Sequence, residues 1–144
     1  MKMLMIRFAF IIFLFCLSGC SLLSPKAEYI PDNKVLKNAA IGVPYFYKIN
    51  ILGGKVIGPN KSEGNIGLVE PDNSGIFLRS CQLSELETKD MKPKDSNNYN
   101  CVEVYGTPTR TGVIKINISG GMYGHMFAPS SEFSKDYILT VIEP

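Results

Sequence analysis

Apolar and polar side chains alternate along several short stretches of this chain, with the period of two that is typical of β-strands. The alternation is clearest in residues 113–119 (VIKINIS), where isoleucine occupies every second position. Residues 43–52 (VPYFYKINIL) also alternate and are rich in aromatic and β-branched side chains, which favour strands. One face of this stretch carries Tyr45, Tyr47, Ile49 and Ile51, and the other carries Phe46, Lys48, Asn50 and Leu52.

Turn-forming residues separate further predicted strands. Residues 71–75 (PDNSG) combine a proline that presets φ with an asparagine and a glycine that accept positive φ, so the strands on either side are expected to form a hairpin. Residues 82–100 are polar and are predicted to be an exposed excursion. About six short strands without an amphipathic helix predict an all-β antiparallel sandwich or barrel. The further strands are expected at residues 66–69, 76–81, 102–105 and 136–142.

The N-terminus is different, because two basic residues precede an unbroken apolar run at residues 8–17. This run is shorter than the roughly 20 apolar residues of a bilayer-spanning helix and is typical of a cleaved signal peptide. Residues 17–20 (LSGC) follow and resemble the lipobox of bacterial lipoproteins, whose cysteine receives diacylglycerol and becomes the first residue after cleavage. The resemblance implies a signal peptide at 1–19 and acyl chains on Cys20. The alternative is an ordinary signal peptide with a cysteine near its end by chance.

The anchor also predicts a location. Several acyl chains hold a protein firmly, since each buried methylene contributes about 0.8 kcal/mol. Ser21 resembles the residue that follows the cysteine in lipoproteins sent to the outer membrane of Gram-negative bacteria, which implies a lipid anchor there, facing the periplasm. Residues 20–38 have mixed polarity and no period, so we predict a flexible tether followed by one domain at 39–144.

The charge of the mature chain excludes one class of partner. Cleavage after residue 19 removes Lys2 and Arg7 and leaves 125 residues with 13 basic and 13 acidic side chains. Nucleic-acid binding draws most of its affinity from a basic excess that neutralises phosphates. No such excess remains, so nucleic acid is not an expected partner.

Two cysteines remain after processing, because Cys16 leaves with the signal peptide and Cys20 is acylated. An oxidising compartment favours pairing of Cys81 with Cys101, and closing a loop of about 20 residues would stabilise the fold by roughly 3 kcal/mol. We therefore predict this disulfide. A metal or redox pair would need closer spacing or several histidines, and the chain has one His, so no metal or cofactor is expected.

Residues 106–118 (GTPTRTGVIKINI) and 137–141 (YILTV) resemble the second half of bacterial putative-Ig, cadherin-like repeats. Those repeats read Gly-Thr-Pro, a turn, Gly, a strand and a closing Tyr-x-Leu-x-Val strand. Their first half opens with Gly-x-Pro-Tyr, as residues 42–45 (GVPY) do. The family's Leu-Pro-x-Gly-Leu stretch is not recognisable here, and residues 82–100 are extra. The resemblance implies a single Ig-like antiparallel β-sandwich over 39–144, used for binding or spacing.

The candidate functional residues lie in a glycine-rich loop expected at 120–135. Aromatic and methionine side chains are enriched at interfaces, which makes this loop a candidate for partner binding. Its candidate residues are Met122, Tyr123, His125, Met126 and Phe127. The alternative is that these side chains pack into the end of the sandwich. The polar excursion has the same two interpretations, a solvated loop or a recognition loop.

The sequence contains no motif that would complete a catalytic site around His125. A histidine base needs an orienting carboxylate and a reactive partner, and neither a nucleophile motif nor clustered carboxylates accompany it. No catalytic residue is predicted, and the chain is not expected to be an enzyme. The expected function is that of a membrane-anchored periplasmic lipoprotein, a non-catalytic binding or structural module whose partners are the membrane and an envelope protein. The alternatives are an inhibitor or immunity-type lipoprotein that blocks an envelope enzyme or receptor, and an envelope hydrolase.

Overall fold

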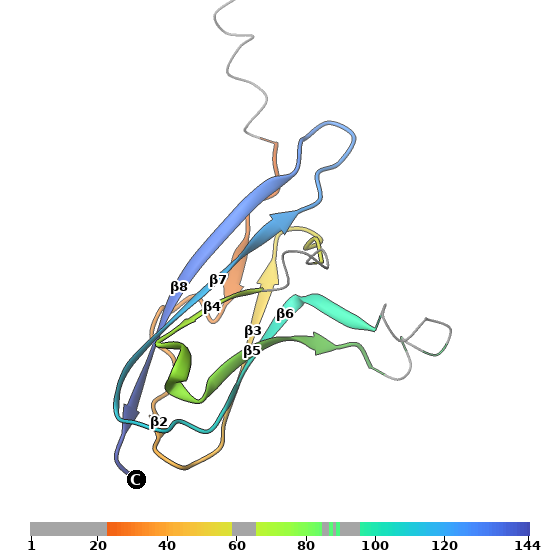
Figure 1. Cartoon of the computed structure of the whole chain (residues 1–144). Helices are drawn as coiled ribbons and strands as arrows, with labels where there is room; N and C mark the ends of the chain where they lie inside the picture. The colour runs from red at the N-terminus through yellow and green to blue at the C-terminus, as the bar shows by residue number, and fades with distance from the viewer. Residues whose placement is uncertain (1–22, 59–65, 85–86, 88, 90–95) are drawn as a thin grey trace, which may run out of the picture.

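The computed structural model describes residues 23–58, 66–84, 87, 89 and 96–144 (Figure 1). In these residues the chain forms eight strands and one short 3-10 helix, η1 (Asp72–Ser74). The strands are β1 (Glu28–Ile30), β2 (Ala39–Ala40), β3 (Tyr45–Leu52), β4 (Gly67–Glu70), β5 (Ile76–Gln82), β6 (Asn97–Gly106), β7 (Gly112–Met122) and β8 (Ser131–Ile142).

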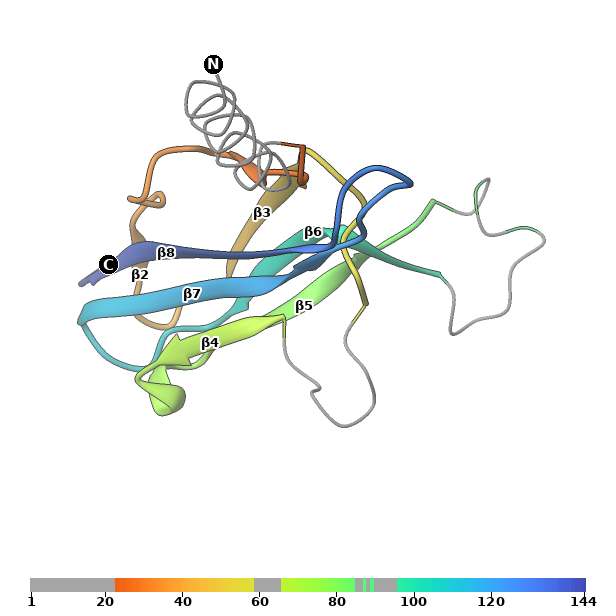
Figure 2. The same ribbon diagram turned by 90° about the horizontal axis from the view of Figure 1, so that it is seen from above.

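The strands form two four-stranded sheets, β1-β3-β6-β5 and β2-β8-β7-β4, which lie one over the other (Figure 2). Within these sheets the pairings are antiparallel except that of β2 with β8. β1 and β2 are two parts of one N-terminal segment that passes from the first sheet to the second. With both counted as strand A, the sheets correspond to strands ABED and CFG of an Ig constant-type domain. The predicted all-β, Ig-like antiparallel sandwich is therefore confirmed.

The core lies between the sheets and follows the alternation of the sequence. Each buried aliphatic side chain contributes roughly 1.5–3 kcal/mol, so facing rows of isoleucine, valine and leucine dominate the stability. Of the two faces of β3, the one that carries Tyr45, Tyr47, Ile49 and Ile51 points inward, since three of these residues are buried and Tyr47 packs against the core. Val102 and Val104 of β6 extend this row within the same sheet. The facing rows come from Ile114, Ile116 and Ile118 of β7 and from Tyr137, Leu139 and Val141 of β8.

The described part of the predicted tether, residues 23–38, differs from expectation because much of it packs on the sandwich. β1 pairs with the end of β3, and Leu36 is buried in the core. Two tyrosines also hold the segment: Tyr137 donates its hydroxyl to the oxygen of Pro31 at 3.0 Å, and Tyr45 donates to the oxygen of Lys37 at 2.9 Å. Burial raises the pKa of both phenols to about 12, so both remain donors at neutral pH. A three-residue strand is too short to show a period in the sequence.

The predicted hairpin between residues 66–69 and 76–81 is wrong. β4 pairs with β7 in one sheet, whereas β5 pairs with β6 in the other. The turn itself is present: η1 ends at Gly75, whose φ of 82° redirects the chain from one sheet to the other. The same residues that permit a hairpin turn thus make a connection across the sandwich.

The predicted disulfide between Cys81 and Cys101 is present, with Cα atoms 5.3 Å apart. It joins neighbouring strands of one sheet, β5 and β6, where the pairing register shifts after Ser80. Part of the predicted excursion is strand, because β6 already begins at Asn97. The predicted glycine-rich loop is also shorter than expected, because β7 continues to Met122 and β8 begins at Ser131.

Candidate functional site

Three aromatic side chains stand side by side on the outer face of the β1-β3-β6-β5 sheet. Tyr105 of β6 is directly opposite Phe46 of β3 and Phe77 of β5 in the strand register. The rings of Phe77 and Tyr105 are in contact, with centroids 6.0 Å apart. Phe46 and Phe77 are each more than half exposed, at 55% and 54%. We call these three residues the aromatic row.

A second row, two residues away from the first on each strand, is charged. Glu103 of β6 lies between Arg79 of β5 and Lys48 of β3. The Arg79 Nε donates to Glu103 Oε2 at 2.6 Å, and the Lys48 Nζ lies 3.6 Å from Oε1. The Glu103 side chain is almost fully covered, whereas both cations are about half exposed. We call these three residues the charged row.

The two rows hold each other in place. The Arg79 guanidinium lies 4.4 Å from the centre of the Tyr105 ring, and the Lys48 ammonium lies 5.8 Å from that of Phe46. Such cation–π contacts each contribute about 0.5–1 kcal/mol at exposed sites. Because Glu103 fixes both cations, the aromatic and guanidinium groups are ordered before any partner arrives. Tyr and Arg dominate interface hot spots, and preorganisation reduces the entropy lost on binding.

Sequence reasoning missed this surface. Phe46 and Lys48 were assigned together to the second face of one strand, but their neighbours Tyr105, Phe77 and Arg79 come from strands far along the chain. The signal was an aromatic residue at an outward position of three different strands. Only the strand order brings the three together.

The predicted partner-binding loop is the connection between β7 and β8, and its five residues separate into two groups. Met122 is fully buried in the core and is not available to a partner. The other four are exposed on a tight turn, closed by His125 and Ala128, which exchange main-chain hydrogen bonds of 2.9 and 3.0 Å. Met126 and Phe127 occupy the two central positions of this turn and are 90% and 77% exposed. We call residues 123–128 the hairpin tip.

The side chain of His125 bonds only locally among the contacts found in the described residues. Its Nδ1 accepts a hydrogen bond from the Phe127 N–H at 3.4 Å. Gly124 is required beside it, because a Cβ there would overlap the main chain of residues 128–130. This arrangement shapes the turn and leaves Met126 and Phe127 projecting from it.

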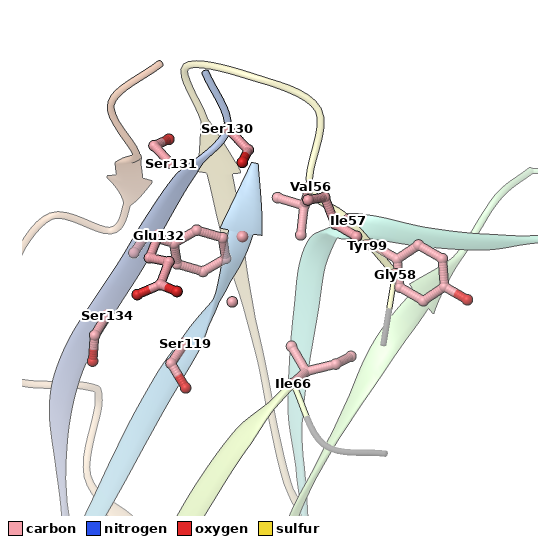
Figure 3. Close-up of a pocket in the computed structure, with 13 residues that line it drawn as sticks. Val56, Ile57, Gly58, Ile66, Tyr99, Ser119, Ser130, Ser131, Glu132 and Ser134 are labelled. Carbon is pink, nitrogen blue, oxygen red and sulfur yellow. The ribbon is translucent and has the colours of Figure 1, made fainter. Parts of the chain in front are cut away.

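A cavity of about 690 Å³ opens near the same end of the sandwich (Figure 3). Its lining mixes apolar groups with four serine hydroxyls and the carboxylate of Glu132. A serine nucleophile needs a base within hydrogen-bond reach, yet Ser131 donates to the oxygen of Pro25 at 2.6 Å, and Ser134 accepts from the Asn117 side chain at 2.9 Å. The hydroxyls of Ser131 and Ser134 thus take part in hydrogen bonds within the fold. The lining residues include Val56, Ile57, Ile66, Tyr99, Ser119, Ser130, Ser131, Glu132, Phe133 and Ser134.

Other candidate features fall outside what the structure describes or are not found in it. Cys16, Cys20 and Ser21 lie outside the described residues. Within the described residues, no cluster of three or more His, Cys, Asp or Glu side chains is placed to bind a metal ion. The described part of the chain also contains no helix of the length and apolarity needed to span a bilayer.

Comparisons with known proteins found no relative of this chain. The chain matches no protein-family model, no curated protein and no solved structure. The resemblance to putative-Ig, cadherin-like repeats therefore stays a prediction from the sequence motifs, while the sandwich itself is established by the strand order.

Proposed function

We propose that this protein is a membrane-anchored periplasmic lipoprotein that binds an envelope protein through the outer face of its β1-β3-β6-β5 sheet and performs no catalysis. The observation that carries this proposal is the aromatic row beside the charged row. Aromatic and arginine side chains in a half-exposed, ordered array have the composition of an interface core, whereas an outward sheet face without a partner is normally polar.

The other sheet provides a contrast that supports the choice of face. Its outer surface carries a polar network in which the Asn117 side chain donates to Ser134 and Asp136. Exposed apolar side chains there are aliphatic, such as Leu68 opposite Asn117, Ile138 opposite Lys115 and Val113 opposite Thr140, and they form no aromatic array. Of the two outer faces described, the first sheet is therefore the one with adjacent aromatic side chains.

Site-specific photocrosslinking in intact cells tests the face. A photoreactive phenylalanine analogue replaces Phe77 on the aromatic row, or Val113 on the other sheet, which is equally exposed at 57%. We expect one discrete adduct from position 77 and none from position 113, and Arg79→Ala should weaken the adduct. Equal adducts at both positions, or none at position 77, would contradict the proposed binding face.

The proposed membrane location rests on sequence features of residues 2–21. Mass spectrometry of the membrane fraction should find a mature chain that begins at an acylated Cys20. A chain that retains Met1, or that starts at an unmodified Ser21, would remove the anchor from the proposal without affecting the binding face.

A further inference from the structure

The hairpin tip exposes two large apolar side chains for which the fold provides no cover. Single exposed apolar residues are common on protein surfaces, but Met126 and Phe127 are adjacent, project from a protruding turn and are the two most exposed large apolar residues of the described chain. The half-exposed ring of Tyr123 adds to the same end. These side chains would become buried only by contact with a molecule outside the domain.

The start of the described chain lies at this end of the sandwich. Figures 1 and 2 show the start of the coloured ribbon at the same end as the β7–β8 connection, whereas β2 and the C-terminus lie at the opposite end. A hydrogen bond fixes this proximity, since Ser131 at the start of β8 donates to the oxygen of Pro25. Leu23 itself is 58% exposed.

The short stretch of chain between Cys20 and Leu23 limits how far the domain can lie from a membrane that holds Cys20. Two residues separate Cys20 from Leu23, and an extended chain spans at most about 3.6 Å per residue, so acyl chains on Cys20 would begin within roughly 11 Å of Leu23. A bilayer that holds Cys20 is thus within reach of the end of the domain that carries the hairpin tip. The aromatic row is near the other end, because Phe46 is at the start of β3.

Charges at this end are compatible with lipid headgroups. The exposed Lys55 is joined to the hairpin, because its oxygen accepts a hydrogen bond from Tyr123 N at 2.9 Å. Lys26 is also exposed and lies against Gly53. The acidic residues nearest this end in the adjoining strands are Glu28 of β1 and Glu132 of β8. A lysine near a membrane surface contributes about 1 kcal/mol of attraction to anionic lipid. The two lysines here balance the two glutamates, so this end carries no net negative charge that would repel such a surface.

We propose that the hairpin tip contacts the lipid bilayer, with Met126 and Phe127 entering the boundary between headgroups and acyl chains. This inference rests on the proposed acylation of Cys20, which brings the tip to the membrane. An acyl tether alone leaves the domain free to tumble, whereas a second contact fixes its orientation. The sandwich then stands on the membrane with its aromatic row held away from the lipid.

Tryptophan fluorescence tests this contact, because the chain contains no Trp. Phe127→Trp places one fluorophore on the tip, and Phe77→Trp places a matched one on an exposed phenylalanine at the far end. The full mature lipoprotein, with acylation verified by mass spectrometry, is reconstituted into vesicles of phosphatidylethanolamine and phosphatidylglycerol. We expect a blue-shifted emission for Phe127→Trp, and a loss of intensity with brominated lipids that is several-fold greater than for Phe77→Trp.

The outcomes separate the two proposals. Equal quenching of both tryptophans in an acylated, vesicle-bound protein overturns the lipid contact and leaves the anchor intact. A blue shift that appears only with envelope proteins and is insensitive to brominated lipid also overturns it, because the occupant is then a protein. A mature chain that carries no acyl group overturns both the anchor and the contact. Both substitutions are at exposed positions, so the fold should survive them.

Discussion

Lys135 reaches from β8 to Asp32 of the N-terminal segment, where its Nζ lies 2.6 Å from both the carboxylate Oδ1 and the main-chain oxygen. The lysine side chain is only 10% exposed and passes between two aromatic rings, 4.7 Å from the centre of Tyr29 and 5.5 Å from that of Tyr137. A single cation on β8 thus fixes the segment that crosses from β1 to β2. The hydrogen bond and the charge of Lys135 together lower the pKa of Asp32 below its ordinary value of 3.8.

Lys135→Met should loosen this crossing. The substitution keeps the length of the side chain but removes two hydrogen bonds and two cation–π contacts. Because Asp32 is exposed to solvent, the loss in the free energy of unfolding at neutral pH should come mainly from the two cation–π contacts, at about 0.5–1 kcal/mol each. Urea titration measures this loss. Lys37→Met is the control, because Lys37 is an exposed lysine of the same segment and should change the free energy little. Equal effects of the two substitutions would contradict the role of Lys135.

The same contact predicts a dependence on pH. A carboxyl whose pKa is lowered in the folded state contributes stability above its unfolded pKa, and this contribution disappears as the pH falls through the folded pKa. The wild type should therefore lose the Asp32 contribution below about pH 3.8, and Lys135→Met should lack that component of its acid sensitivity. NMR titration of the Asp32 carboxyl provides the direct measurement, with a midpoint that rises toward 3.8 in Lys135→Met.

Asn100→Ala should be among the more damaging polar substitutions. The Asn100 amide donates to the oxygens of Ile51 and Gly54 at 2.8 and 2.6 Å and accepts from the Val56 N–H at 3.0 Å. Each partly buried group left unpaired costs about 1–3 kcal/mol, so a total loss of roughly 3 kcal/mol is expected by urea unfolding. Asn50→Ala, at an exposed position opposite Cys101, should cost less than about 0.5 kcal/mol.

Asn100 also illustrates what the sequence could and could not predict. The strands and the core of β3 and β7 were predictable because alternation is a local property of the chain, and the cysteine pair was predictable from number and compartment. The sequence places Asn100 at the end of a predicted exposed excursion. Its hydrogen-bond partners are 44 to 49 residues away along the chain, so no local pattern reveals them. The aromatic row could not be predicted for the same reason, since strand order decides which outward residues become neighbours.

The disulfide should be a measurable part of the stability. Cys81 and Cys101 are 20 residues apart, and the loop they close would restrict the unfolded chain by roughly 3 kcal/mol. Replacing both cysteines by serine should lower the midpoint of urea unfolding, and a reductant should lower that of the wild type to a similar value. The double variant is its own control, because reductant should not affect it further. Two free thiols in the native protein would contradict the bond.

Gly75→Ala tests the turn that carries the chain from β4 to β5. Gly75 has a φ of 82°, and a Cβ at this position would overlap the main-chain oxygen of Thr107. Gly42 is a matched control with a φ of 72° and no neighbour within 4 Å of the added Cβ. We expect Gly42→Ala to cost about 1–2 kcal/mol from backbone strain alone and Gly75→Ala clearly more. Similar losses at both positions would show that the close approach to Thr107 is relieved at little cost.

Glu103→Gln tests whether the charged row orders the binding face. The amide keeps the shape of the side chain but removes the charge that holds Arg79 and Lys48, so the guanidinium should leave the face of Tyr105. Because both cations are half exposed and can be hydrated, the stability loss should stay near about 1 kcal/mol. Glu70→Gln, at an exposed position on the other sheet, is the matched control. If the charged row preorganises the surface, the crosslinked adduct from position 77 should weaken in Glu103→Gln and persist in Glu70→Gln. An adduct unchanged in both variants would mean that the aromatic row binds without the support of its charged neighbours.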